Sequence, residues 1–147
     1  MKAIVQRVSH ASLCVDDEVV SAIGVGLVVL AAVQMGDTAA DETWMSKKLV
    51  HMRIFPDQTG KMNRSVLDAG GQIMLVSNFT VAGQTRKGRR PSFVDAMGPA
   101  EAQIAFDSLV EAVGGQGASV VTGVFGAHMM LRLTNDGPVT LIVDSRA

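Results

Sequence analysis

Residues 2–33 read KAIVQRVSHASLCVDDEVVSAIGVGLVVLAAV, an alternation of apolar and polar side chains that becomes a continuous apolar run. Alternation with a period of two is typical of a strand with one buried face, and a short apolar run is typical of a fully buried strand. The pattern predicts strands over 2–8 and 11–15 with a bend at Ser9-His10, a hairpin turn at Asp16-Asp17, and further strands over 18–23 and 24–33. The chain therefore opens with a β-sheet.

The rest of the chain adds two helices and more strands. Thr38 and Pro99 are suited to begin the helices, and Gly114-Gly115 is suited to end the second. The predicted segments are a helix over 38–52, turns over 55–60, a strand over 72–77, a loop over 83–97, a helix from 99 to about 114, and strands over 118–122, 127–133 and 139–144. We expect one α+β, mainly β domain spanning 1–147: a curved, mainly antiparallel sheet or barrel with two helices.

The charge balance limits the kind of partner. Thirteen Lys and Arg against fourteen Asp and Glu give a net charge of -1, which excludes a uniformly basic surface that coats nucleic acid. Only residues 85–91 concentrate cations, namely Arg86, Lys87, Arg89 and Arg90. This segment is either a solvated loop or a clamp on RNA phosphates.

Residues that bind metals or nucleotide cofactors are not arranged in the usual motifs. His10, His51 and His128 lie far apart, and Cys14 is the only cysteine, so no metal and no disulfide is expected. Gly24-Val25-Gly26 lacks the third glycine of a dinucleotide loop, so no nucleotide cofactor is expected either. No basic region followed by an apolar run opens the sequence, so secretion is not expected. The longest apolar run is about half of the roughly 20 residues that cross a bilayer. We expect a cytoplasmic protein without a membrane segment.

Ser77-Asn78-Phe79-Thr80 follows the apolar stretch 73–76 directly. A strand that ends in hydroxyl and amide side chains can present polar groups and backbone N–H donors to a ligand, and such donors can form an oxyanion hole. The alternative is a polar strand end whose hydroxyl groups bond locally.

Gly137-Pro138 lies between the last two predicted strands. The dipeptide fits an ordinary tight turn or a proline in the cis form, which costs only about 0.5–1 kcal/mol at an X-Pro bond. The residues alone leave both interpretations open.

The chain nevertheless resembles the D-aminoacyl-tRNA deacylase family along nearly its whole length. The resemblance is carried by segments in the same order and spacing: Lys2 to Val8, Arg53-Ile54-Phe55, Gly60 to Asn63, Ser77 to Thr80, Gly88 to Phe93 and Asn135 to Thr140. It implies a homodimer that hydrolyses the ester of D-aminoacyl-tRNA, and of glycine mischarged on tRNA-Ala, as translation quality control.

The resemblance also implies roles for particular residues. Gly137 and Pro138 are expected to form a Gly-cis-Pro motif that enters the partner's pocket and excludes L-amino acids. For the chemistry, our own hypothesis is that Phe79 and Thr80 offer backbone N–H groups to the substrate carbonyl. Ser77 and the Thr80 hydroxyl would orient the substrate at the tRNA 3′ end, and the 2′-hydroxyl of the tRNA would assist.

One position departs from the family pattern. Asn78 stands where the family usually has glutamine, and its side chain is one methylene shorter, so its amide is expected to need a bridging water or a shifted backbone. Two other functions remain open: an editing deacylase with relaxed chirality, and a non-catalytic module that binds RNA ends.

Overall fold

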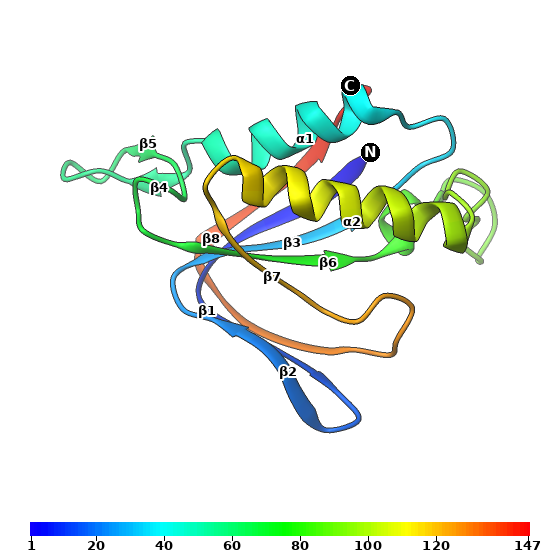
Figure 1. Cartoon of the computed structure of the whole chain (residues 1–147), viewed down its shortest axis with the longest axis horizontal. Helices are drawn as coiled ribbons and strands as arrows, with labels where there is room; N and C mark the ends of the chain where they lie inside the picture. Colours follow the sequence, from blue (N-terminus) through cyan, green and yellow to red (C-terminus); the bar gives the residue numbers. More distant parts are fainter.

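The computed structural model describes the whole chain, residues 1–147, as one curved six-stranded sheet with two helices and a small hairpin (Figure 1). The elements in chain order are β1 (Lys2–Val15), β2 (Glu18–Ile23), β3 (Gly26–Ala32), α1 (Ala39–His51), β4 (Phe55–Pro56), β5 (Met62–Arg64), β6 (Gln72–Ser77), the 3₁₀ helix η1 (Phe79–Ala82), α2 (Pro99–Gly115), β7 (Ser119–Thr122) and β8 (Met130–Asp144). The predicted α+β class with a mainly β architecture is confirmed.

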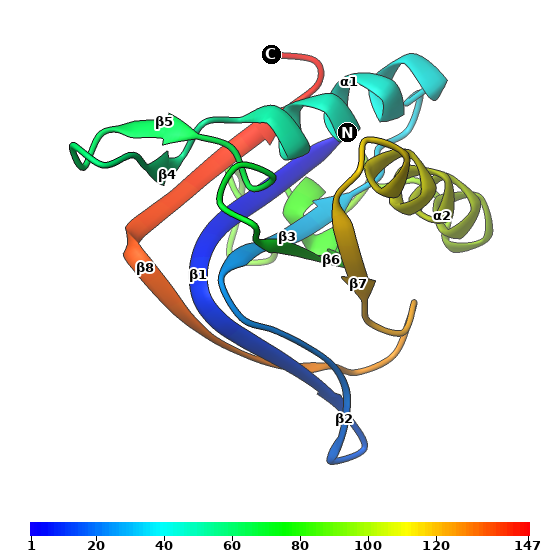
Figure 2. The same cartoon turned by 60° about the vertical axis from the view of Figure 1, so that its left-hand side comes forward.

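Strand β1 organises the sheet. Its first half pairs with β3, its second half pairs with β2, and its other edge pairs with β8, all antiparallel. The prediction of two strands separated at Ser9-His10 is wrong, because β1 bends there without ending (Figure 2). Pairing to β8 continues on both sides of this bend, which keeps the strand continuous.

The apolar run predicted as a buried strand becomes β3, which pairs with β6 in parallel, as β6 does with β7. These parallel pairings were not predicted. In β3, Leu27 and Val29 face a core beneath the helices, while Val28 faces a second core inside the curve of the sheet. Burial on both faces explains why the sequence of this strand does not alternate.

Both helices cover the same face of the sheet (Figure 1). Helix α1 ends one residue earlier than predicted, and Thr38 precedes it with its N–H donating to Asp41 Oδ2 at 2.9 Å. Helix α2 buries Phe106 and Leu109 against Leu49 of α1 and the sheet, as its spacing predicts. Neither helix has the length and apolar content that crossing a membrane would require.

The sequence predicted only turns where β4 and β5 form a hairpin. Asp57 organises its tip: the carboxylate accepts from Asn63 Nδ2 at 2.6 Å and from the Thr59 hydroxyl at 2.7 Å. These bonds, that of Asn63 first, lower the pKa of Asp57 to about 2. The hairpin extends beyond the C-terminal end of α1 (Figure 2).

Asp41 links the end of the chain to α1. Its carboxylate accepts from the Ser145 hydroxyl at 2.7 Å, and this bond is the main cause that lowers the pKa of Asp41 from 3.8 to about 2. A folded-state pKa below the unfolded value contributes stability that is complete above about pH 4 and is lost as the pH falls towards 2.

Replacing Ser145 tests this contribution. We expect Ser145→Ala to lower the melting temperature at pH 7. Between pH 4 and pH 2 the melting temperature of the variant should fall less steeply than that of the parent. Identical pH profiles of both proteins in thermal melts would contradict this.

Candidate active site

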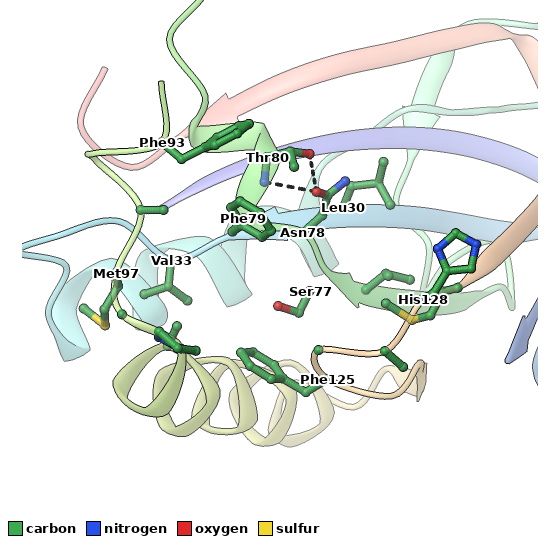
Figure 3. Close-up of a pocket in the computed structure, with 18 of the residues that line it drawn as sticks. Leu30, Val33, Ser77, Asn78, Phe79, Thr80, Phe93, Met97, Phe125 and His128 are labelled. Carbon is green, nitrogen blue, oxygen red and sulfur yellow. Dashed lines mark hydrogen bonds between the residues drawn. The ribbon is translucent and has the colours of Figure 1, made fainter. Parts of the chain in front are cut away.

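A pocket of about 950 Å³ opens where β6 ends (Figure 3). Buried residues Ile73 to Val76 carry the strand to Ser77, whose side chain is partly exposed. Figure 3 shows the Ser77 side chain in the middle of this space, with Phe79 and Thr80 on one side and Phe125 on the other. The strand therefore ends in polar residues at the edge of a cavity.

Asn78 holds the backbone after Ser77. Its N–H donates to Ala31 O at 2.8 Å, which extends the pairing with β3 by one residue. Its side-chain Oδ1 accepts from Thr80 N at 3.1 Å and from the Thr80 hydroxyl, and thereby caps η1. The shorter amide thus caps η1 directly.

The two proposed oxyanion donors differ in this structure. The Phe79 N–H has no hydrogen-bond partner in the chain, as expected at the first position of a helix. The Thr80 N–H and hydroxyl both bond Asn78, so either must share or release that bond in order to reach a substrate. Phe79 is therefore the available donor.

The Phe79 ring makes an aromatic contact, although the residue is largely exposed. Its centroid lies 5.1 Å from that of Phe93, with the rings at 75°. Gly83, which ends η1, makes this contact possible, because an added Cβ would lie 2.8 Å from the Phe93 ring. Through this contact Phe93 packs the end of the 83–93 segment against η1.

The walls of the pocket are largely apolar. They come from β3, the start of α2 and the segment before β8, and include Leu30, Val33, Met97, Phe125 and Met129. His128 is the only titratable residue that lines the pocket. Such a cavity suits a ligand with a flat or apolar body, and Ser77, Asn78 and Thr80 add polar groups to its lining.

The four predicted phosphate-binding cations lie at the tip of a loop beside this pocket. Gln84 and Ser92 exchange two backbone hydrogen bonds, at 2.8 and 2.9 Å, and so close the loop. Between them Arg86, Lys87, Arg89 and Arg90 are exposed and make no ion pair in the chain. We call residues 84–92 the basic loop.

Gly137 and Pro138 lie elsewhere, inside the single long strand β8, so the prediction of two separate strands there is wrong. Gln6 pairs with Thr140 and Val8 pairs with Asn135, so residues 136–139 stand opposite Arg7 alone and leave the ladder. The Asn135 side chain closes this 136–139 loop by accepting from Val139 N at 2.8 Å and donating to Val139 O at 3.0 Å. The Gly137-Pro138 peptide is cis.

The 136–139 loop is not part of the chain's own pocket, whose lining ends at Leu131. Arg7 holds the base of the loop: its Nε donates to Asp136 O at 2.9 Å and its Nη1 to Ile54 O at 2.5 Å. Arg7 is only 8% exposed. Sequence reasoning missed this role, although a charge in the same register as Ala3 and Val5 was a signal of a buried, partnered cation.

Metal-binding side chains are not clustered: no three of the chain's His, Cys, Asp and Glu residues lie together where they would hold an ion. The polar groups around the pocket are hydroxyls, an amide, an imidazole and backbone N–H groups. Such a set can bind a carbonyl oxygen and stabilise negative charge on it.

Comparison with known proteins gives concordant results. A family model described as D-Tyr-tRNA(Tyr) deacylase matches residues 4–144. The chain is 53% identical over 146 residues to a D-aminoacyl-tRNA deacylase of Kosmotoga olearia, covering 99% of this chain and 98% of that protein.

Two solved structures share the fold. The c-Myc DNA unwinding element binding protein is 38% identical, with a TM-score of 0.95 and full coverage of both chains. A probable eukaryotic D-amino acid tRNA deacylase has a TM-score of 0.83 at 18% identity over 97% of both chains.

Proposed function

Because the chain belongs to the D-aminoacyl-tRNA deacylase family, we propose that it hydrolyses the ester of D-aminoacyl-tRNA in the cytoplasm, releasing the D-amino acid and free tRNA. Glycine mischarged on tRNA-Ala is a further substrate, because it has no side chain to exclude. The observation that best supports the proposal is the Phe79 N–H, which has no partner in the chain and belongs to a residue that lines an apolar pocket. The role is quality control of translation.

The proposed chemistry needs no side-chain nucleophile. A water molecule, assisted by the ribose 2′-hydroxyl, adds to the ester carbonyl, and the developing oxyanion accepts from Phe79 N–H and then from Thr80 N–H. When the intermediate collapses, the bond to the ribose oxygen breaks, and that oxygen takes up the proton that the attacking water has lost, which the 2′-hydroxyl passes on. Ser77 and the Thr80 hydroxyl orient the substrate. An amino-acid ester is already activated, so positioning and charge stabilisation suffice.

For chirality, we propose that the 136–139 loop enters the pocket of a second copy. Gly137 and Pro138 then set backbone carbonyls against the substrate α-carbon, where hydrogen fits and an L side chain does not. The position of this loop outside the chain's own pocket supports a role across a homodimer. A twofold interface would give two equivalent sites.

The outer edge of β8 supports self-association. This strand of 15 residues pairs only with β1, so its other edge has no partner strand in the chain. It also exposes large apolar side chains: Met130 at 55%, Leu141 at 37% and Ile142 at 75%. Long apolar edge strands are normally covered, and a second copy would cover this one.

Hydrolysis assays with D-aminoacyl-, L-aminoacyl- and glycyl-tRNA test the proposal. We expect cleavage of the D and glycyl esters and survival of the L ester. Cleavage of L esters would instead identify an editing deacylase with relaxed chirality, and no cleavage at all would identify a module that binds RNA ends.

The basic loop gives a separate prediction. If Arg86, Lys87, Arg89 and Arg90 contact phosphates near the single-stranded 3′ end, replacing all four with Gln should lower the slope of log affinity against log salt by up to about 3. Filter binding with full-length tRNA at several salt concentrations measures this. An unchanged slope would show that the loop is only solvated.

A further inference from the structure

The exposed face at the C-terminal end of α1 carries cations that the proposed function does not use. Residues 43–56 contain Lys47, Lys48 and Arg53 together with His51, and no acidic residue, in a chain whose net charge is -1. The four side chains line a cleft of about 480 Å³ together with Trp44 and Met52. We call Lys47, Lys48, His51 and Arg53 the α1 cluster.

The cations of the α1 cluster are free to bind a partner. Lys47, Lys48 and Arg53 are exposed, and none of them forms an ion pair in the chain. Trp44, the only tryptophan, is 40% exposed, and the Lys48 ammonium lies 5.4 Å from its ring centroid. Unpaired cations beside an exposed aromatic ring suit the phosphates and sugars of a nucleic acid.

The fold connects this cluster to the 136–139 loop. The Arg7 guanidinium bonds Ile54 O and Asp136 O at the same time, and Arg53 immediately precedes Ile54. Figure 2 shows the C-terminal end of α1 and the β4–β5 hairpin on the same side of the molecule as the bend in β8. The cluster and the loop therefore share one flank of the protein.

We propose that the α1 cluster binds the phosphate backbone of the acceptor stem of a tRNA whose 3′ end lies in the partner's pocket. This inference rests on the proposed function, because the 136–139 loop must enter that pocket for the cluster to flank it. Each tRNA would then contact both subunits: the basic loop of the subunit that hydrolyses the ester, and the α1 cluster of the subunit that checks chirality.

The test compares a charge-removing variant, Lys47→Gln/Lys48→Gln/Arg53→Gln, with a charge-keeping control, Lys47→Arg/Lys48→Arg/Arg53→Lys. Binding of labelled, non-acylated full-length tRNA is measured across a salt series. We expect the first variant to lose at least about tenfold in affinity at low salt and to lower the salt slope by about 2–3. The control should bind tRNA as tightly as the parent does. In the parent, binding of tRNA should also change the fluorescence of Trp44. Equal affinity and equal salt dependence in the parent and both variants would overturn the proposal.

Kinetics separate this inference from the proposed function. With full-length D-aminoacyl-tRNA, the charge-removing variant should show a raised KM and an unchanged kcat, whereas a D-aminoacyl-adenosine fragment, which has no stem, should be cleaved equally by all three proteins. If the charge-removing variant lost as much activity on the fragment as on the full-length tRNA, the α1 cluster would not act through the acceptor stem, and the proposal would be overturned. If no protein cleaves either ester, the proposed function fails, while the tRNA-binding comparison still decides whether the α1 cluster binds RNA.

Discussion

Phe79→Pro is expected to lower kcat for D-aminoacyl-tRNA about a hundred- to a thousandfold, the loss typical of removing one oxyanion donor. Proline removes the Phe79 backbone N–H, which donates to no acceptor in the chain. The position tolerates proline, because Phe79 begins η1 and Asn78 before it is extended, with φ -147° and ψ 91°. Single-turnover hydrolysis measures the effect, and circular dichroism confirms that the fold is retained.

Phe79→Ala is the matched control, because it keeps the N–H and removes the ring that contacts Phe93. We expect its kcat to fall by less than about tenfold, far less than with proline. Equal losses in both variants would assign the effect to the ring and contradict the backbone donor. Thr80→Ala adds a second check, since a loss of several orders of magnitude would indicate a side-chain nucleophile instead.

Gly137→Ala is expected to weaken chiral discrimination. Gly137 has φ +149°, and an added Cβ would lie 2.7 Å from the backbone nitrogen of Val139, so the 136–139 loop must move. Displaced carbonyls would leave room for an L side chain, and we expect the ratio of kcat/KM for D over L esters to fall by at least about tenfold. Gly24→Ala is the control, because nothing lies within 4 Å of its Cβ position.

Mixed dimers show whether the 136–139 loop acts across the interface. A dimer of Phe79→Pro and Gly137→Ala chains contains one pocket with an intact Phe79 that faces an intact Gly137 of its partner. If the loop acts in the partner's pocket, this dimer should cleave D esters and regain discrimination against L esters. Discrimination as poor as that of the Gly137→Ala homodimer would show that each chain selects for itself.

Local signals in the sequence were sufficient for most elements. Thr38 and Pro99 mark the helix starts because capping and proline preferences act within one turn, and the buried faces follow from the helical period. The end of β6 at Ser77 followed from an apolar stretch that runs into polar residues. Each of these features depends on neighbours in the chain.

Features that depend on distant partners were missed. Alternation does not encode strand direction, so the parallel pairing of β3 with β6 was not predicted. Gly and Pro favour turns, so residues 137–138 were predicted to separate two strands. In the structure the segments before and after them both pair with β1 and form the single strand β8. The role of Arg7 depends on Ile54 and Asp136, which lie 47 and 129 residues away in the chain.

The placement of the 136–139 loop outside its own pocket has a consequence for how fidelity depends on protein concentration. If chirality is checked by the partner, a dissociated chain keeps its oxyanion donor but loses the group that rejects L esters. Mass action then sets accuracy, because dilution below the dimer dissociation constant converts a selective enzyme into an indiscriminate one. A cell could protect its normal aminoacyl-tRNAs by keeping subunits tightly paired.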